Sequence, residues 1–147
     1  PSGRCRCTAE QVQRYRGKLS GPLLDRIDMQ VDVPAVPVND IVGSAPKAES
    51  SAAIRARVVL ARNIQLARSG MTNACLDARQ VDERCCVTHA ATEYLLHVIE
   101  RLGLSARSFH RVIKVARTIA DLSEEAELSD RHVAEALRYR SYSGQGA

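Results

Sequence analysis

The sequence is poor in aromatic side chains and lacks long apolar runs. Its 147 residues include no tryptophan, one phenylalanine and four tyrosines. Any core must therefore be filled by leucine, isoleucine, valine and alanine, which suits closely packed helices. No apolar run approaches the roughly 20 residues that a membrane-spanning helix needs, and no apolar segment follows a basic start as in a signal peptide. We therefore expect a cytoplasmic protein with no membrane partner.

The cysteines do not form the even, spaced set of a disulfide framework. There are five, and Cys85 and Cys86 are adjacent, which favours reduced thiols in a reducing compartment. Cys5 and Cys7 can supply two of the four thiolates of a zinc site, but two reduced surface thiols are the simpler interpretation. Cys85, Cys86 and His89 resemble a ligand set, yet they lie between the end of one predicted helix and the start of the next, where packing is the better explanation.

A glycine-rich phosphate loop of the form GxxxxGK[ST] is also missing. Two arginines nevertheless indicate a site for phosphate. Arg26 lies in the stretch LSGPLLDRID, between a Pro-Leu-Leu turn and a segment of alternating apolar and polar residues. Arg107 lies in the first turn of a predicted helix, where the helix dipole disfavours a cation unless an anion is near. The remaining parts of such a site must lie elsewhere.

Each arginine also has a simpler interpretation. Arg26 can be a surface ion-pair partner of Asp25 or Asp28. The second arginine can be one solvated member of a basic helix face, which can alternatively contact nucleic-acid phosphates. That face carries Arg107, Arg111 and Lys114. The net charge of +4 permits contact with nucleic acid, but acidic and basic residues are interspersed without a basic block, so charge alone is weak evidence.

The first 50 residues predict one helix, one strand and a linker. A helix over residues 8–18 opens with the letters TAEQ, which form a capping box. Ser-Gly-Pro at 20–22 ends it, because proline lacks an N–H and biases its predecessor away from helix. Alternation in IDMQVDV predicts a strand over residues 27–33. Prolines, a glycine and small polar residues give residues 34–50 the composition of a linker, where we place a boundary.

The remainder is helical in pattern, with a tail from Ser141 that we expect to be disordered. Helices are predicted over about 51–69, 77–84, 89–102 and 106–122, and after Ser129. The first of them places Ile54, Val58 and Ala61 on one face. The strongest core signal is the apolar stripe of the helix over 106–122, which comprises Phe109, Val112, Ile113, Ala116, Ile119 and Ala120.

A family resemblance rests on three blocks in order: CRCTAEQVQRYRGKLSGPLLDRIDMQVDVP, SSAAIRARV and RLGLSARSFHRVIKVARTIADL. They closely resemble the C-terminal part of the magnesium-chelatase-like AAA+ ATPases, in the branch of the competence proteins, over nearly the whole chain. The resemblance implies a mainly α fold. Residues 1–48 would be the C-terminal end of an α/β ATPase core, and residues 49–147 an all-helical lid domain. The Walker motifs would precede residue 1, so we expect this chain alone not to hydrolyse ATP.

The resemblance also assigns roles to residues. Arg26 matches the arginine finger and Arg107 the sensor-two arginine, which also contacts the nucleotide. The family commonly carries a further cysteine pair upstream, which would complete a zinc site with Cys5 and Cys7. The implied cofactors are therefore ATP and Mg²⁺, with zinc as a further candidate, all in the full-length protein and none in this chain alone.

The function implied is that of a hexameric, ring-forming motor that binds DNA and drives branch migration in natural transformation. The motor subunit of a magnesium-chelatase-type metal-insertion complex is the alternative within the same branch. A third hypothesis is a helical DNA-binding module over residues 50–147. It ranks last, because the helix over 106–122 commits its stripe to packing and shows no paired Asn/Gln pattern for base edges.

Overall fold

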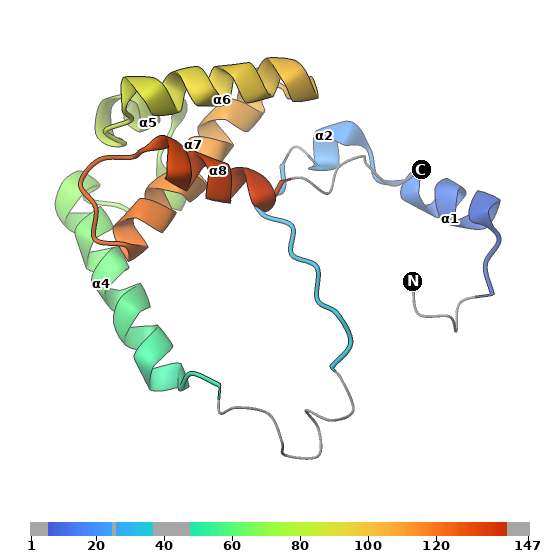
Figure 1. Cartoon of the computed structure of the whole chain (residues 1–147), viewed down its shortest axis with the longest axis horizontal. Coiled ribbons are helices and arrows are strands. Elements are labelled where there is room, and N and C mark those ends of the chain that lie inside the picture. The colour runs from blue at the N-terminus through green and yellow to red at the C-terminus, as the bar shows by residue number, and fades with distance from the viewer. Residues whose placement is uncertain (1–5, 25, 37–47, 141–147) are drawn as a thin grey trace.

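The fold is built from helices, as predicted. The computed structural model describes residues 6–24, 26–36 and 48–140 (Figure 1). The helices in these ranges are α1 (Ala9–Arg16), α2 (Gly21–Leu24), α4 (Ser51–Ser69), the 3-10 helix η1 (Asn73–Cys75), α5 (Ala78–Arg84), α6 (His89–Leu102), α7 (Ala106–Leu122) and α8 (Asp130–Arg138). The β-structure of the described residues is limited to one isolated bridge between Val87 and Leu128. The mainly α fold class is thereby confirmed.

Local capping chemistry sets the helix ends. The side chain of Ser50 accepts a hydrogen bond from the N–H of Ala53 (3.3 Å) at the start of α4, and Thr88 and Ser105 cap α6 and α7 in the same way. Helices α4 and α6 end at Gly70 and Gly103, as predicted. Both glycines have positive φ, +72° and +61°, a conformation that costs glycine little.

A bundle of helices encloses one core, with α7 at its centre. Figure 1 shows α7 running between α4, α6 and α8, and it packs against all three. Four of the six residues in its predicted stripe are fully buried, and the other two, Phe109 and Ile119, pack against the core from its edge. The cluster they join contains Leu76, Val81, Cys85, Ala91, Leu95, Leu128, Val133, Ala136 and Leu137. Aliphatic side chains thus fill the core, as the composition requires.

The predicted strand over residues 27–33 is wrong for this structure. The described residues 26–36 run without helix or strand, and Met29, Val31 and Val33 are exposed. A strand needs a partner for its backbone groups. One such bond is present, from the N–H of Gln30 to the carbonyl oxygen of Tyr139 (2.8 Å), and it joins the segment to the end of α8. The alternation of apolar and polar residues therefore does not correspond to a buried face in this structure.

Other differences lie near the predicted boundaries. The Ser-Gly-Pro break leads directly into α2, which has Pro22 in its first turn, where a missing N–H costs nothing. Along α4, Ala61 is buried, whereas Ile54 and Val58 are exposed, so the core covers only the C-terminal half of this helix.

Most of the predicted linker, residues 37–47, and the tail from Ser141 lie outside the described residues. None of the described helices combines the length and apolarity needed to cross a bilayer.

Candidate functional site

Arg26 lies in the turn after α2, with its side chain exposed. Its backbone is held from two directions. The N–H donates to the carbonyl oxygen of Leu23 (3.0 Å), and the carbonyl oxygen accepts from Arg111 Nη1 (2.8 Å). The same Arg111 forms an ion pair with the carboxylate of Asp28. Asp28 is therefore the partner of Arg111, and Asp25 lies outside the described residues. Within the described ranges the guanidinium of Arg26 makes no recorded hydrogen bond or ion pair.

Arg107 lies in the first turn of α7, exposed, where the sequence predicts it. It is four residues before Arg111, and residues at this spacing are neighbours on one helix face. Because Arg111 binds the backbone of Arg26, the structure places that backbone one helical turn from Arg107. The two arginines predicted to handle phosphate, 81 positions apart in the chain, therefore belong to neighbouring segments of the fold.

The end of α8 provides a second attachment for the same segment. Arg140 Nη1 donates to the carbonyl oxygen of Ile27 (3.4 Å), and its Nη2 donates to Ser108 Oγ on α7 (3.3 Å). The bond from Gln30 to Tyr139 adds a third connection. Residues 26–30, which we call the finger segment, are thus tied to both α7 and α8.

The basic face of α7 is largely engaged within the protein. Arg111 binds the finger segment, and Lys114 Nζ donates to the carbonyl oxygen of Ala74 in η1 (3.3 Å). Within the described part of the chain, Arg107 is the member of this face for which no partner is recorded. Arg107, Arg111 and Lys114 therefore do not form a continuous stripe of available cations for nucleic-acid phosphates.

The C-terminal half of α7 carries a buried ionic network that the sequence analysis missed. Arg117 is fully buried, and its Nε donates to Asp121 Oδ1 (3.1 Å) while its Nη1 donates to the carbonyl oxygen of Ala126 (2.7 Å). Arg68 of α4 binds both oxygens of the Asp121 carboxylate, at 2.6 and 2.8 Å. Asn73 Nδ2 donates to Asp121 Oδ2 (2.8 Å). The only sequence signal is the four-residue spacing of Arg117 and Asp121, which normally indicates a surface pair.

The network keeps the Asp121 carboxyl ionised. Burial opposes the charged form, but hydrogen bonds from Arg68 and Asn73 and the positive charge of Arg117 outweigh it, so the pKa of Asp121 is lowered. Arg68 Nη1 and Nη2, Asn73 Nδ2 and Arg117 Nε all donate within the bundle, whereas Arg68 Nε is buried without a partner among the described residues. The network therefore fixes α7 against α4 and η1.

The candidate metal ligands are not brought together. Cys5 lies outside the described residues, and Cys7 is exposed. Cys85 is fully buried, and burial raises the pKa of its thiol to about 11, which disfavours the thiolate that binds metal. Cys86 and His89 are exposed, and His89 lies 3.5 Å from a carboxylate oxygen of Glu93. Across the described ranges no group of three or more potential ligands is placed to hold a metal ion.

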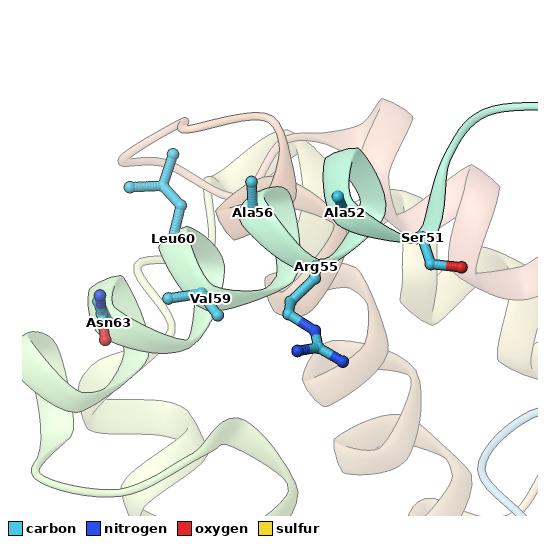
Figure 2. Close-up of a pocket in the computed structure, with 7 residues that line it drawn as sticks. All are labelled: Ser51, Ala52, Arg55, Ala56, Val59, Leu60 and Asn63. Carbon is cyan, nitrogen blue, oxygen red and sulfur yellow. The ribbon is translucent and has the colours of Figure 1, made fainter.

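A shallow hollow follows the exposed half of α4 (Figure 2). All seven lining residues belong to this one helix: Ser51, Ala52, Arg55, Ala56, Val59, Leu60 and Asn63. Ligand sites usually gather polar groups from several elements around an enclosed volume. The hollow lacks that arrangement, and the arginines next to α7 remain the better candidate site.

Comparison with known proteins agrees with the resemblance. Residues 48–140 match the family described as magnesium chelatase, subunit ChlI C-terminal, and residues 1–41 match the family described as magnesium chelatase, subunit ChlI. Competence protein ComM of Haemophilus influenzae is 39% identical over 136 residues, and YifB of Salmonella typhimurium, an uncharacterized protein, is 40% identical over 136 residues. Rv2897c of Mycobacterium tuberculosis is 35% identical over 140 residues. These matches cover 92% of this chain but 27% of each relative.

Proposed function

The chain belongs to the magnesium chelatase ChlI family, a branch of the AAA+ proteins, and on that premise we propose that it is the C-terminal part of an ATP-driven motor. Residues 1–48 end the α/β ATPase core, and residues 49–147 form the helical lid. Arg26 acts as an arginine finger and Arg107 as the sensor-two arginine. The nucleotide, its Mg²⁺ and the Walker motifs belong to the full-length protein.

The chemistry explains why two arginines would be used. During ATP hydrolysis negative charge spreads over the γ-phosphoryl oxygens, and a guanidinium that reaches them stabilises the transition state, by roughly 10³–10⁵ in rate for arginine fingers of well-studied GTPases. Arginine stays charged and can donate two parallel hydrogen bonds. A finger given to the neighbouring subunit makes hydrolysis depend on ring assembly, and Arg107 at the start of α7 can respond to the nucleotide.

One observation carries this proposal. The Arg26 side chain is exposed, no partner is recorded for it among the described residues, and its backbone is fixed next to the helix that carries Arg107. A surface ion-pair arginine would engage a nearby carboxylate, but the described carboxylate, Asp28, is taken by Arg111. A cation whose backbone is held, and whose guanidinium has no partner among the described residues, fits a ligand supplied by another molecule.

The test is Arg26→Ala in the full-length protein. We expect rings to assemble as before while ATP turnover falls by about three orders of magnitude or more. Lys18→Ala is the matched control, because Lys18 is an exposed cation on the same N-terminal part of the chain and should leave turnover unchanged. Normal turnover by Arg26→Ala rings would refute the assignment.

Two kinds of motor fit this family. The resemblance to the competence proteins, one of which is a relative of this chain, implies a hexameric, homo-oligomeric ring that binds DNA and drives branch migration. The family description favours the motor of a magnesium-chelatase-type metal-insertion complex. Stimulation of ATP hydrolysis by DNA would support the first, whereas no stimulation together with binding to chelatase subunits would support the second. A separate DNA-binding module over residues 50–147 is disfavoured, because Arg111 and Lys114 are engaged within the chain.

A further inference from the structure

We propose that Arg111 is a positioning residue, which clamps the finger segment to α7 so that movement of this helix moves Arg26. This inference rests on the proposed role of Arg26 as an arginine finger. It connects Arg107 and Arg26 within one subunit through Arg111. The helix that carries the nucleotide-responsive Arg107 also holds, one turn further along, the segment that presents Arg26 to the neighbouring subunit.

The geometry of the clamp supports this role. One guanidinium of Arg111 binds the finger segment twice, at the carbonyl oxygen of Arg26 and at the carboxylate of Asp28. Both bonds are donated by one nitrogen, Nη1, so they hold the Arg26 carbonyl oxygen and the Asp28 carboxylate at one point beside α7. The side chains of Arg111 and Asp28 are 26% and 51% exposed, and ion pairs of this exposure add little stability. The contact is therefore better suited to placing a residue than to holding the fold together.

The finger segment has few other attachments. Its two apolar side chains, Ile27 and Met29, are 40% and 45% exposed, and neither belongs to the hydrophobic core or packs against it. Besides Arg111, the recorded bonds from the bundle to the described residues of this segment come from Arg140 and Tyr139, at the end of α8. The position of Arg26 is therefore set mainly by polar contacts from α7 and α8.

Helix α7 can transmit a displacement as one piece. Val112 and Ile113, directly after Arg111, are fully buried, and the same helix continues to the buried Arg117. Arg107 and Arg111 lie within one turn of this packed helix, so a shift that follows a change of nucleotide at Arg107 also shifts Arg111. The clamp then carries the shift to the finger segment.

The clamp can be tested in this chain without nucleotide. Trypsin cleaves after arginine, and the carbonyl of the Arg26–Ile27 bond is the group that Arg111 holds. In Arg111→Ala, which removes both contacts, we expect cleavage at this bond to accelerate about tenfold, the factor that corresponds to about 1.4 kcal/mol of lost anchoring. In Asp28→Asn, which removes only the ion pair, we expect a smaller acceleration of about two- to fourfold. Cleavage after the exposed Lys18 serves as the internal reference.

Lys114→Ala is the matched control variant. It removes the next cation of the same face, which bonds to η1 and not to the finger segment, and it should leave cleavage after Arg26 unchanged. Asp28→Asn guards against misfolding, because Asp28 lies outside the bundle. An unchanged cleavage rate after Arg26 in both Arg111→Ala and Asp28→Asn would overturn the clamp.

The full-length protein tests the consequence for activity. We expect Arg111→Ala to lower kcat for ATP about a hundredfold, the loss that a small misplacement of a reacting group produces, with KM for ATP unchanged. Arg111→Lys should recover part of kcat, and adding Asp28→Asn to Arg111→Ala should cost little more, because both remove the same contact. A purely structural role would instead lower thermal stability and kcat together.

The outcomes separate this inference from the proposed function. If the Arg26→Ala variant loses ATP turnover while the Arg111→Ala variant hydrolyses ATP normally, the positioning role of Arg111 is refuted and the arginine-finger role of Arg26 is retained. If the Arg26→Ala variant hydrolyses ATP normally, the arginine-finger role is refuted. The positioning role of Arg111 is then refuted too, even if the cleavage assay shows that Arg111 holds the finger segment.

Discussion

Replacing Asp121 by alanine tests the buried ionic network most directly. The substitution removes the carboxylate that binds Arg68, Asn73 and Arg117. Arg68 keeps its bond to Asn73 Oδ1 (2.8 Å), and with a side chain 17% exposed it can reach water. Arg117 has no exposure at all, and Asp121 is the one carboxylate that pairs with it among the described residues, so its charge would stay buried without a counter-ion. Breaking a buried pair in this way costs about 3–5 kcal/mol.

That loss is a large part of the stability of a domain of this size. Small domains have free energies of unfolding of about 5–15 kcal/mol, so Asp121→Ala should fold but be much weakened. With a slope of about 2 kcal/mol per molar urea, the unfolding midpoint should fall by about 2 M. Glu127→Ala is the control, since this exposed carboxylate has no recorded partner within the described residues, and it should change the free energy by less than about 0.5 kcal/mol. A loss below about 1 kcal/mol for Asp121→Ala would refute the reasoning.

Two further predictions follow from the pKa values. The lowered pKa of Asp121 means that its stabilising contribution is complete above its ordinary pKa of 3.8 and is lost as the pH falls through the lower folded value. The difference in unfolding free energy between wild type and Asp121→Asn should accordingly be constant from neutrality to pH 3.8 and shrink below it; a difference already shrinking near pH 6 would contradict this. The Cys85 thiol, buried and with a pKa of about 11, should resist alkylation in the native state near pH 8, while the exposed Cys75 and Cys86 react. Mass spectrometry of alkylated peptides checks this, and equal labelling of Cys85 and Cys86 would count against the burial.

The helix ends and the core stripe were predictable because they depend on neighbouring residues. A hydroxyl at Ser50, Thr88 or Ser105 caps the turn that follows it, and a glycine at the end of α4 or α6 takes up positive φ within one turn. These signals are complete within about four residues of sequence. Helices α4, α6 and α7 accordingly begin and end where the sequence predicts.

The failures concern partners that are distant in sequence. The alternation of apolar and polar residues over 27–33 predicted a strand. It carries no information on a strand partner, and none is present among the described residues. The spacing of Arg117 and Asp121 gave no sign of burial, because the groups that enclose the pair, Arg68 among them, come from α4 and η1. The prediction from the sequence therefore missed the buried polar groups of the interior.

For the candidate site, the dipole argument and the family resemblance identified Arg107 and Arg26, and their roles remain predictions. What the sequence could not supply was the contact from Arg111 to Asp28, two residues 83 positions apart. Arg111 was noted only as one cation of a basic face. The contacts of Arg111 with the finger segment are apparent only in the fold, which places that segment against α7.

The uneven burial of α4 divides one helix into two regimes of backbone motion. Its last turns are held by Ala61, Gln65 and Arg68 in the bundle, whereas residues 51–60 are exposed along their whole length. Hydrogen exchange at the first amides therefore requires only unwinding from the Ser50 end, while exchange at the last ones requires the whole bundle to open. Neighbouring turns of a single continuous helix would then differ in protection by as much as separate elements of the fold usually do.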